Sequence, residues 1–446
     1  MSNTLAERDD VQRAVAQALD LAARLGADQA EAGASTEQGL SVTVRLGEVE
    51  TLEYQRDRGL GVTVYFGNRK GSASTADLAE QTVRETVEKA CSIARFTAED
   101  ECAGLADPEM MASEIPDLDL FHPWDIDAEH AIDLARACES AGRGVDKRIN
   151  NSEGASISSH SARRVYGNSH GFLHGFQSTS HSASCAMLAS QDDHMERDYW
   201  YTSARDAADM EDVESVGRRA GARTVRRLGA RKLATARVPV LFPPELARGL
   251  IGHFTAAVRG GAQYRGSSFL LKADGEQIFP EWIDLKEWPH LQKAMASAPF
   301  DSEGVATRDR TLVQDGVLRG YLLDSYSARK LGLQTTGSAG GLHNLVVTPR
   351  QTMSPEAMLQ KMGTGLLIGE LMGQGVNGVT GDYSRGAAGF WVENGEIMYP
   401  VHEITVAGNL RDIYRGIQAV GDDLDSRGAI HSGSILIDQM MVAGDQ

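Results

Sequence analysis

The order helix, alternating strands, helix occurs twice in the first half of this chain, and it constrains the fold more than any single motif does. Residues 11–25 carry apolar side chains at helical spacing, and Gly26 ends the pattern. Two segments of alternating character follow, LSVTVRLGEVETLEYQ and LGVTVYFGNRKGSAS, with glycine where each would turn, which predicts hairpins. An apolar helical face then runs over residues 79–94. Residues 1–97 are therefore predicted to form a helix–sheet–helix unit.

The same order returns after an acidic, proline-containing linker at about residues 98–124. Asp127 is placed to cap a helix with an apolar face, strand-like sequence covers residues 149–202, and a helix is expected from about residue 207 to Gly229. Residues 125–232 are predicted to form a second helix–sheet–helix unit. No repeat at the level of individual residues accompanies this recurrence.

The pattern of residue types changes at about Val238, where VPVLFP indicates a buried strand. Asp315-Gly316 and Asn394-Gly395 have the composition of hairpin turns, and short helices are expected from Ser354 and over residues 410–419. The chain closes on SGSILIDQMMV, which reads as a strand. Residues 233–446 are predicted to form a mostly antiparallel β domain with peripheral helices, which makes the fold class α+β.

Charge argues against a nucleic-acid partner. The 446 residues include 44 basic and 62 acidic side chains, and the resulting net charge of −18 repels a polyanion. Basic side chains do gather near the end of the second unit, at Arg218, Arg219, Arg223, Arg226, Arg227, Arg231 and Lys232. No aromatic residues are interleaved with them, so the segment is interpreted as a solvated helix end rather than a direct nucleic-acid contact.

The sequence also predicts the cellular compartment. No apolar run approaches the length of a membrane span, and MSNTLAERDD lacks the basic and apolar parts of a signal peptide. The four cysteines show no CxxC spacing and fit reduced thiols. A cytoplasmic protein with no membrane contact is therefore expected.

Two histidine patterns could suggest a metal site. His402-Glu403 begins like a zinc-peptidase motif, but a second histidine one helical turn later is missing, and the alternation around the pair predicts a strand. His170 and His174 are four residues apart in HGFLH, where the glycines and phenylalanines favour extended chain. Four extended residues span roughly 13 Å, whereas zinc ligands lie within about 2.1 Å of one ion. Neither pattern predicts a metal site.

Glycine is abundant in the C-terminal half, but no phosphate-binding loop or nucleophile elbow occurs there. Tight hairpins and close approach of backbone segments account for such glycines. A groove that receives an extended peptide would also use exposed backbone groups of this kind.

Three stretches carry a family resemblance: FDSEGVATRDR, SYSARKLGLQTTGSAGGLHN and MGQGVNGVTGDYSRGAAGFWVENGEIMYPVHEITVAGNL. The chain resembles the TldD/PmbA family, and within it the PmbA branch, also called TldE. The resemblance covers nearly the whole chain and is densest from about residue 240. The third stretch, residues 372–410, is called the glycine-rich block below. Its resemblance is highly specific, because chance agreement over so many residues is negligible.

The resemblance also implies a lost metal site. The catalytic TldD branch carries H-E-x-x-x-H on a helix, and the matching stretch here is RGLIGH. Arg248 stands at the first histidine, Gly249 at the glutamate, and only the second histidine is kept, as His253. Ser432 in IHSGS matches a late cysteine ligand of TldD. No metal, no cofactor and no catalytic residue is therefore expected in this chain, and zinc is expected in a TldD partner.

The function implied by the resemblance is that of the non-catalytic subunit of a TldD–TldE heterodimer. Such a complex cleaves unfolded or unstructured peptides, including the leader of a ribosomally made microcin. Alone, the chain could pair with a second copy as a homodimer. Two alternatives stay open: a metallopeptidase active on its own, and a non-proteolytic protein-binding regulator, since the family has also been described as a modulator of DNA gyrase.

The glycine-rich block supplies the candidates for peptide binding or subunit contact. Asp382, Tyr383, Ser384 and Arg385 could provide hydrogen bonds or ion pairs, and Phe390 and Trp391 could provide packing. Equally, both aromatic residues could be the core of a hairpin.

Overall fold

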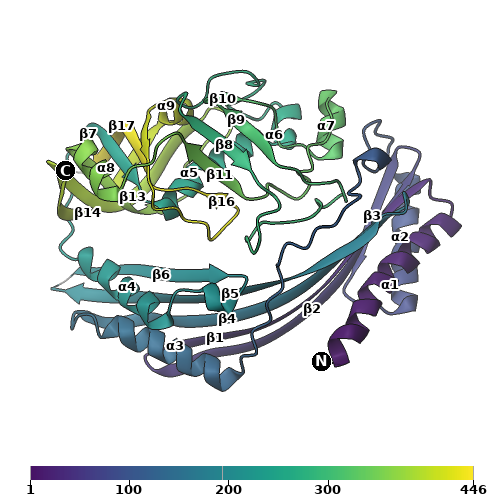
Figure 1. Ribbon diagram of the computed structural model, residues 1–446, viewed down its shortest axis with the longest axis horizontal. Helices are drawn as coiled ribbons and strands as arrows, with labels where there is room; N and C mark the ends of the chain where they lie inside the picture. The colour runs from purple at the N-terminus through teal and green to yellow at the C-terminus, as the bar shows by residue number, and fades with distance from the viewer. Residues whose placement is uncertain (1, 193, 445–446) are drawn as a thin grey trace.

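A computed structural model describes residues 2–192 and 194–444. A long curved sheet with its helices forms one layer, and a second body made from the C-terminal half lies over it (Figure 1). This mixture of helices and sheets confirms the predicted α+β fold class. Within the described ranges, no helix is both long and apolar enough to cross a membrane.

The first layer is one sheet rather than two. Its strands, in the order β3-β2-β1-β4-β5-β6, are β1 (Gln29–Arg45), β2 (Glu48–Phe66), β3 (Arg69–Thr75), β4 (Ile149–Asn168), β5 (Leu173–Gln191) and β6 (His194–Ala204). Strands β1 and β4 pair antiparallel from Glu31↔Asn168 to Val44↔Ala155. The two predicted helix–sheet–helix units therefore share a hydrogen-bonded seam. The division of the chain at 97/98, 124/125 and 232/233 stays a prediction.

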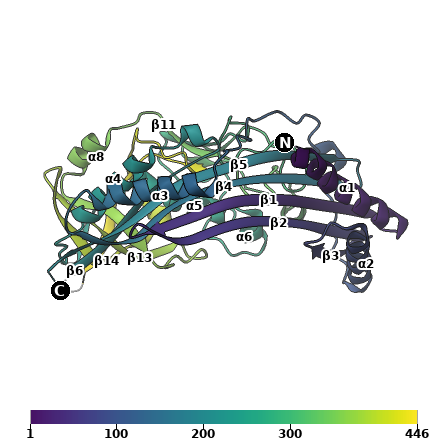
Figure 2. The ribbon, with the colours of Figure 1, turned by 90° about the horizontal axis from the view of Figure 1, so that it is seen from below.

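Helices cover one face of this sheet (Figure 2). They are α1 (Ser2–Arg24), α2 (Glu80–Phe96), α3 (Ala128–Arg143) and α4 (Val213–Arg226). Their apolar faces pack on the alternate strand residues that point toward them, such as Val62 under α1 and α2 and Val42 under α3. The opposite side chains of the same strands are left to face the C-terminal body.

The capping residues decide where two of these helices begin. Asp127 caps α3 by accepting a hydrogen bond from the His130 amide at 2.8 Å, as predicted. The helix expected from residue 207 begins later, so that prediction is wrong by several residues. Only a 3₁₀ turn (Ala207–Asp209) lies there, and α4 starts after Asp212, whose carboxylate accepts from the Ser215 amide.

Two sheets make up the C-terminal body. The strands of the first, in the order β10-β9-β8-β11-β16, are β8 (Ile283–Glu287), β9 (Arg310–Gln314), β10 (Val317–Leu318), β11 (Leu345–Pro349) and β16 (Ile430–His431). The strands of the second, in the order β14-β13-β12-β7-β17-β15, are β7 (Ala236–Phe242), β12 (Gly365–Met372), β13 (Asp382–Glu393), β14 (Glu396–Asn409), β15 (Ile417–Val420) and β17 (Ile435–Gly444). A further pairing of β14 with β17 closes the second sheet on itself.

The helices of this body are α5 (Pro244–Ala257), α6 (Gly260–Tyr264), α7 (Ser325–Leu331), α8 (Pro355–Met362) and α9 (Leu410–Arg415). Helix α5 is central, because Leu250, Ile251 and Phe254 are buried in the main hydrophobic core. Its partners there include Phe242 and Tyr414. The core therefore fixes the position of the helix that carries RGLIGH.

The two turns and the strand predicted for this body are confirmed, and one predicted helix is corrected. Asp315-Gly316 and Asn394-Gly395 have positive φ at both residues, as a tight hairpin turn requires. His402-Glu403 lies in strand β14, as predicted. The helix predicted over residues 410–419 is too long: it ends at Arg415, because Ile417–Val420 forms β15 and pairs with β17.

Candidate functional site

Three adjoining cavities lie between the sheet and the C-terminal body. The first cavity, of about 550 Å³, is bounded by β1, β4 and the loops 295–302 and 339–343. The second cavity, of about 700 Å³, shares Arg205 and Met295 with the first. The third cavity, of about 550 Å³, shares Glu211 and Arg427 with the second. The shared residues place the three cavities in a row, one beside the next, between the two layers.

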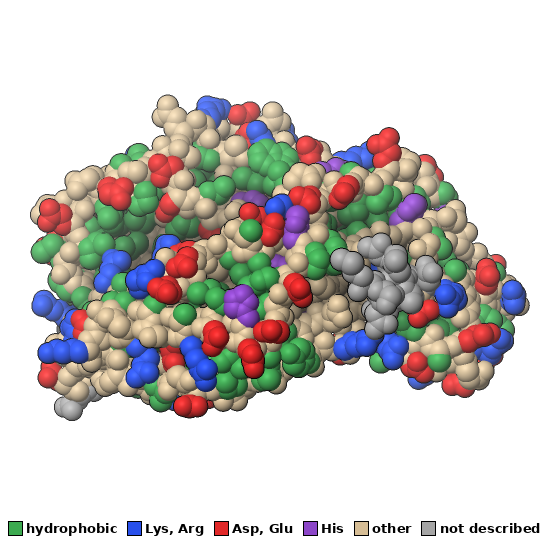
Figure 3. Space-filling model, turned by 60° about the horizontal axis from the view of Figure 1, so that its bottom comes forward, with side chains coloured by type: hydrophobic (Ala, Val, Ile, Leu, Met, Phe, Trp, Pro, Cys, Tyr) green, Lys and Arg blue, Asp and Glu red, His purple; other side chains and the backbone are tan. Residues whose placement is uncertain are grey.

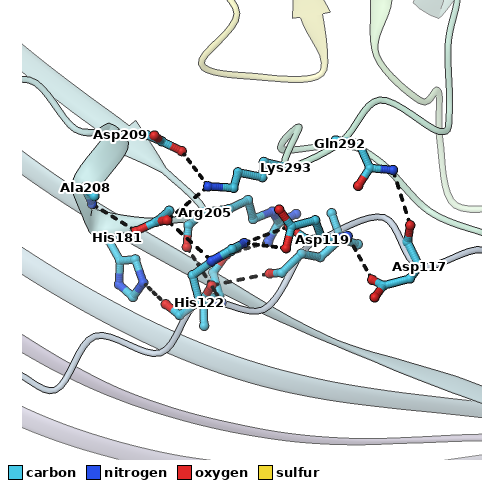
Figure 4. Close-up of polar contacts among 12 residues, drawn as sticks. Asp117, Asp119, His122, His181, Arg205, Ala208, Asp209, Gln292 and Lys293 are labelled. Atoms are coloured by element: carbon cyan, nitrogen blue, oxygen red, sulfur yellow. Dashed lines mark hydrogen bonds and ion pairs between the residues drawn. The ribbon is translucent and has the colours of Figure 1, made fainter.

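A polar junction separates the first two cavities (Figure 4). Arg205, just after β6, donates to the Thr179 carbonyl at 2.8 Å and to the Met295 carbonyl at 2.6 Å. Lys293 of the facing loop contacts Asp206 at 3.0 Å and Asp209 at 3.3 Å. Since Arg205 and Lys293 each connect the sheet layer to loop 289–298, the junction holds the two layers in register.

A buried histidine, His181, binds the linker next to this junction. The ring of His181 on β5 contacts the His122 carbonyl at 2.8 Å and the Ser159 hydroxyl at 3.0 Å. Burial lowers the pKa of His181, which favours its neutral form. The linker that carries His122 is thereby attached to the sheet.

Arg248, the first residue of RGLIGH, is engaged in an ion pair on α5. Its guanidinium donates to the Tyr201 hydroxyl and lies 3.7 Å from Oδ2 of Asp425. Arg427 binds the same carboxylate through two hydrogen bonds of 2.9 Å and stacks over the Tyr201 ring at 4.2 Å. Burial opposes ionisation of Asp425, but the hydrogen bonds from Arg427 and the charge of Arg248 outweigh it and lower the pKa of Asp425.

Ser432 lies next to this ion pair. Its backbone exchanges hydrogen bonds with Asp425, at 3.0 and 3.3 Å, so the structure brings Ser432 near Arg248. The Ser432 side chain is fully buried, and its hydroxyl donates to the Gly433 carbonyl at 2.8 Å. That hydroxyl is therefore committed to its own loop.

His253 has different neighbours. It lies five residues after Arg248 on α5, a separation that places the two side chains on different sides of the helix. The His253 ring contacts the Tyr383 ring edge-on, with centroids 6.0 Å apart. Burial and the charge of Arg385 lower the pKa of His253. At Gly249, an added Cβ would meet no atom within 4 Å, so a longer side chain there would have room.

These residues do not fit a zinc ion. Arg248 only donates hydrogen bonds and keeps its charge, Gly249 offers no side chain, and the Ser432 hydroxyl already has its partner. In the part of the chain that the structure describes, no group of three or more His, Cys, Asp and Glu side chains could hold a metal ion. His170 also lies in the turn between β4 and β5 rather than in extended chain, and only His174 belongs to a strand.

The glycine-rich block divides its candidates between two sides of β13. Tyr383 is buried beside His253, and burial raises the pKa of Tyr383 to about 12 although Arg385 opposes the shift. Asp382 and Ser384 are exposed on the other side, and Asp382 accepts a hydrogen bond from the Thr380 hydroxyl at 2.7 Å. Strand alternation explains this division.

The two aromatic residues of the block lie near the boundary of the layers. Phe390 is almost buried, and the Arg226 guanidinium of α4 stacks over its ring at 4.7 Å. Trp391 packs against the main core, and its indole N–H donates to Glu393 at 2.9 Å. Phe390 thus contacts the first layer, while Trp391 is mainly a packing residue.

The arginines of α4 correct one prediction. Arg223 pairs with Glu245 of α5 at 2.7 Å, and Arg227 pairs with Glu370 of β12 at 2.6 Å. Both arginine side chains are largely buried, so the predicted solvated helix end is wrong for these two. They instead join the two layers. In the view of Figure 3, acidic and basic side chains are interspersed with apolar ones over the coloured surface.

Sequence reasoning missed the partners of Arg248. Tyr201 and Arg427 are 226 residues apart in the chain, yet the Arg427 guanidinium donates to the Tyr201 carbonyl. The available signals were the aromatic pair Trp200-Tyr201 and the charged run DDLDSR around Asp425. Neither signal indicates the other without the fold.

Comparison with known families matches three segments of the chain. Residues 30–94 match domain 1 of the PmbA/TldA metallopeptidases, residues 121–228 match their central domain, and residues 235–444 match their C-terminal domain. Metalloprotease PmbA of Escherichia coli O157:H7 is 52% identical over 100% of this chain and 98% of that protein. The metalloprotease PmbA homolog of Haemophilus influenzae is 48% identical over 99% of this chain and 97% of that protein.

Solved structures share the fold over nearly the full length. A putative modulator of DNA gyrase from Bacteroides thetaiotaomicron superposes with a TM-score of 0.91 at 28% identity, covering 97% of this chain and 98% of that one. TldE from Thermococcus kodakarensis superposes with a TM-score of 0.85 over 97% of this chain and 100% of that one. At 20% identity, the latter likeness shows the fold alone. The chain belongs to the PmbA/TldD metallopeptidase family, within its PmbA branch.

Proposed function

We propose that this chain is the non-catalytic subunit of a heterodimeric peptidase whose TldD-like partner holds zinc and cleaves unfolded or unstructured peptides. The proposal rests on the position of Arg248 in the sequence and on the contacts of its side chain. A guanidinium stands where the catalytic branch has a histidine ligand, and it is paired with Asp425 and Tyr201. Arginine stays protonated and accepts no hydrogen bond, so it can neither ligate a metal nor act as a base at physiological pH.

The neighbouring positions support the same role. Gly249 supplies no general base, and Ser432 supplies a hydroxyl that is bonded to the Gly433 carbonyl. The chain therefore lacks the means to activate water at this position, while the surrounding fold is kept over its whole length. A subunit that keeps the fold of the family but lacks the metal ligands and the general base is expected to serve binding or assembly.

The row of cavities supports a role in holding peptide. An extended segment can be held at several places along its length, and the three neighbouring cavities offer such places between the layers. A folded domain could not enter so confined a space. Substrates are accordingly unfolded or unstructured peptides, with the leader of a microcin precursor as one example.

Association with the partner is the direct test. This chain and the protein from the same genome that carries H-E-x-x-x-H would be purified separately, mixed and analysed by sedimentation velocity. A one-to-one complex is expected, and the zinc found in it should be bound by the partner alone. If the two proteins sediment separately, and capture of this chain from its own cytosol retains no such partner, the heterodimer proposal fails.

Two alternatives have distinct outcomes. A metallopeptidase active on its own would cleave peptides in the absence of the partner and lose activity with a chelator. A non-proteolytic regulator of the gyrase-modulator type is favoured by the description given to the Bacteroides structure, and it would bind a protein without peptide cleavage. The net charge of −18 opposes direct DNA binding in either case. We place the chain in the cytoplasm and expect a homodimer when the partner is absent.

A further inference from the structure

We infer that the first cavity binds the carboxylate of a peptide, with Arg205 and Arg164 as the cations that receive it. This inference rests on the proposed function, because it names the chemical group by which a peptide substrate would be held. The cavity is lined by strand residues from β1, β4 and β5 and by two loops of the C-terminal body. The residues that matter for the argument are Ser35, Arg164, Tyr166, Arg205, Asp301 and Ser302.

Arg205 is a largely buried guanidinium without an acidic partner. Its side-chain hydrogen bonds go to the neutral carbonyls of Thr179 and Met295, and its Nε–H has no hydrogen-bond partner among the described residues. A buried cation normally has a carboxylate beside it, because desolvation is otherwise costly. Arg205 therefore brings to the cavity lining a positive charge that no acidic partner among the described residues balances.

The charged group that acts on Arg205 is another cation. Burial lowers the pKa of Arg205, and the charge of Arg164 lowers it further, while no carboxylate acts in the opposite direction. Arg164 is an exposed residue of β4 that lines the same cavity, and its side chain has no hydrogen bond or ion pair with any described residue. Two guanidiniums thus face one space, which favours an anion between them.

The one carboxyl group that lines this cavity does not fill that role. Asp301 accepts hydrogen bonds from the backbone amides of Glu303, Val305 and Ala339, at 2.9 to 3.0 Å. It is therefore held by its own loop and the neighbouring one. Burial raises the pKa of Asp301 to about 7, so its negative charge is also weakened at neutral pH.

The size and walls of the cavity suit the end or side chain of a peptide. Its volume of about 550 Å³ exceeds what one small anion needs, and the second cavity adjoins it across Arg205 and Met295. Loop 295–298 presents Met295, Ala296, Ser297 and Ala298, mostly small side chains that leave room for a chain. A carboxylate held by the arginines would leave the rest of the peptide in the row of cavities.

Two sources of carboxylate have the same chemistry, namely a peptide C-terminus and an Asp or Glu side chain. Fluorescent peptides of one unstructured sequence distinguish them: one with a free C-terminus, one amidated, and one amidated with an added internal Glu. Binding to the full-length chain would be measured by anisotropy at moderate salt. The wild-type chain should bind at least one carboxylate peptide about tenfold more tightly than the neutral amidated peptide.

The test variant is Arg164→Gln, since Arg164 is exposed and makes no bond that the fold needs. The preference for carboxylate should fall to about twofold or less in this variant. The matched control is Arg197→Gln, which removes an exposed arginine of β6 that pairs with Glu153 outside the cavity, and its preference should stay as in the wild type. Arg205→Lys, checked for folding by circular dichroism, should also reduce the preference.

Equal binding of all three peptides, or a preference that survives Arg164→Gln, would overturn the inference. Its failure is separable from that of the proposed function. If the mixture with the partner cleaves peptides but no carboxylate preference exists, the cavity assignment is wrong and the heterodimer stands. If the preference exists but the partner neither binds nor cleaves, the carboxylate site stands and the heterodimeric function fails.

Discussion

The guanidinium of Arg248 on α5 lies 3.7 Å from the carboxylate of Asp425, so this arginine is paired with a buried acid. Arg427 binds the same carboxylate from the other side, and the three side chains form one charged group between the layers. Under the proposed function, this contact stands at a position where the catalytic branch has a metal ligand. The predictions below follow from this contact and its neighbours.

The first prediction concerns Asp425. Changing Asp425 to Asn leaves two guanidiniums without their carboxylate, and should lower the free energy of unfolding at pH 7 by about 1–3 kcal/mol. The pKa of Asp425 is lowered in the folded chain, so its stabilisation is complete above the ordinary carboxyl pKa. It is lost as the pH falls through the lowered folded value.

Urea unfolding over a series of pH values checks this. The variant should lose the part of the acid dependence that belongs to Asp425, while Asp422→Asn, at an exposed position in the same loop, should behave like the wild type. Identical stability of Asp425→Asn and wild type at pH 7 would show that the pair with Arg248 contributes little.

The second prediction concerns zinc. His253 is the one residue of RGLIGH that matches a ligand, and a tight zinc site needs three or four ligands. Metal analysis of the purified chain after zinc loading and desalting should find only traces. Stoichiometric zinc that is lost on His253→Ala would contradict the account of a dismantled site.

The third prediction concerns Arg385. Changing Arg385 to Ala should weaken partner binding or peptide turnover, while the melting temperature changes by less than about 2 °C. The side chain has a buried Nε without a partner among the described residues, a long 3.5 Å bond to the Leu371 carbonyl and a hydrogen bond with the neighbouring Tyr383 side chain on the same strand, so the isolated fold is expected to depend little on it.

The same variant has a local readout. The charge of Arg385 lowers the pKa of His253, so its removal should raise that pKa, which titration by nuclear magnetic resonance can follow. A fall in melting temperature with full activity of the complex would instead make the glycine-rich block purely structural.

The fourth prediction concerns the contact between α4 and α5. Arg223 and Glu245 form a 2.7 Å ion pair in which both side chains are mostly buried. Glu245→Gln should destabilise the chain by about 1–3 kcal/mol, because it leaves Arg223 with Asp198 alone. The double variant Arg223→Met with Glu245→Met should be more stable than the sum of the single changes predicts. Additive effects would mean that the two residues do not interact.

Local signals explain why much of the fold could be predicted from the sequence. Asp315-Gly316 and Asn394-Gly395 adopt positive φ at low cost, so their turns can be read from composition. Asp127 supplies a side-chain acceptor for a free amide, and it caps α3. Such features depend on a few adjacent residues, so they can be predicted without knowledge of the fold.

The remaining features depend on contacts distant in the sequence. The seam of β1 and β4 joins residues more than a hundred positions apart, and alternation alone does not say which strands become neighbours. For the site, RGLIGH identified α5 and its lost ligand, but Asp425 and Tyr201 became visible as partners of Arg248 only through folding. The cavity arginines were missed for the same reason, since Arg164 lies on β4 and Arg205 directly after β6.

The measurement that tests the central claim most directly is a peptidase assay on an unstructured peptide, with each subunit alone and with both together, in the presence and absence of a chelator. The account predicts no cleavage by this chain alone, poor cleavage by the partner alone, and efficient chelator-sensitive cleavage by the mixture. His253→Ala in this chain should leave the activity of the mixture unchanged. Chelator-sensitive cleavage by this chain in preparations free of the partner would contradict the account.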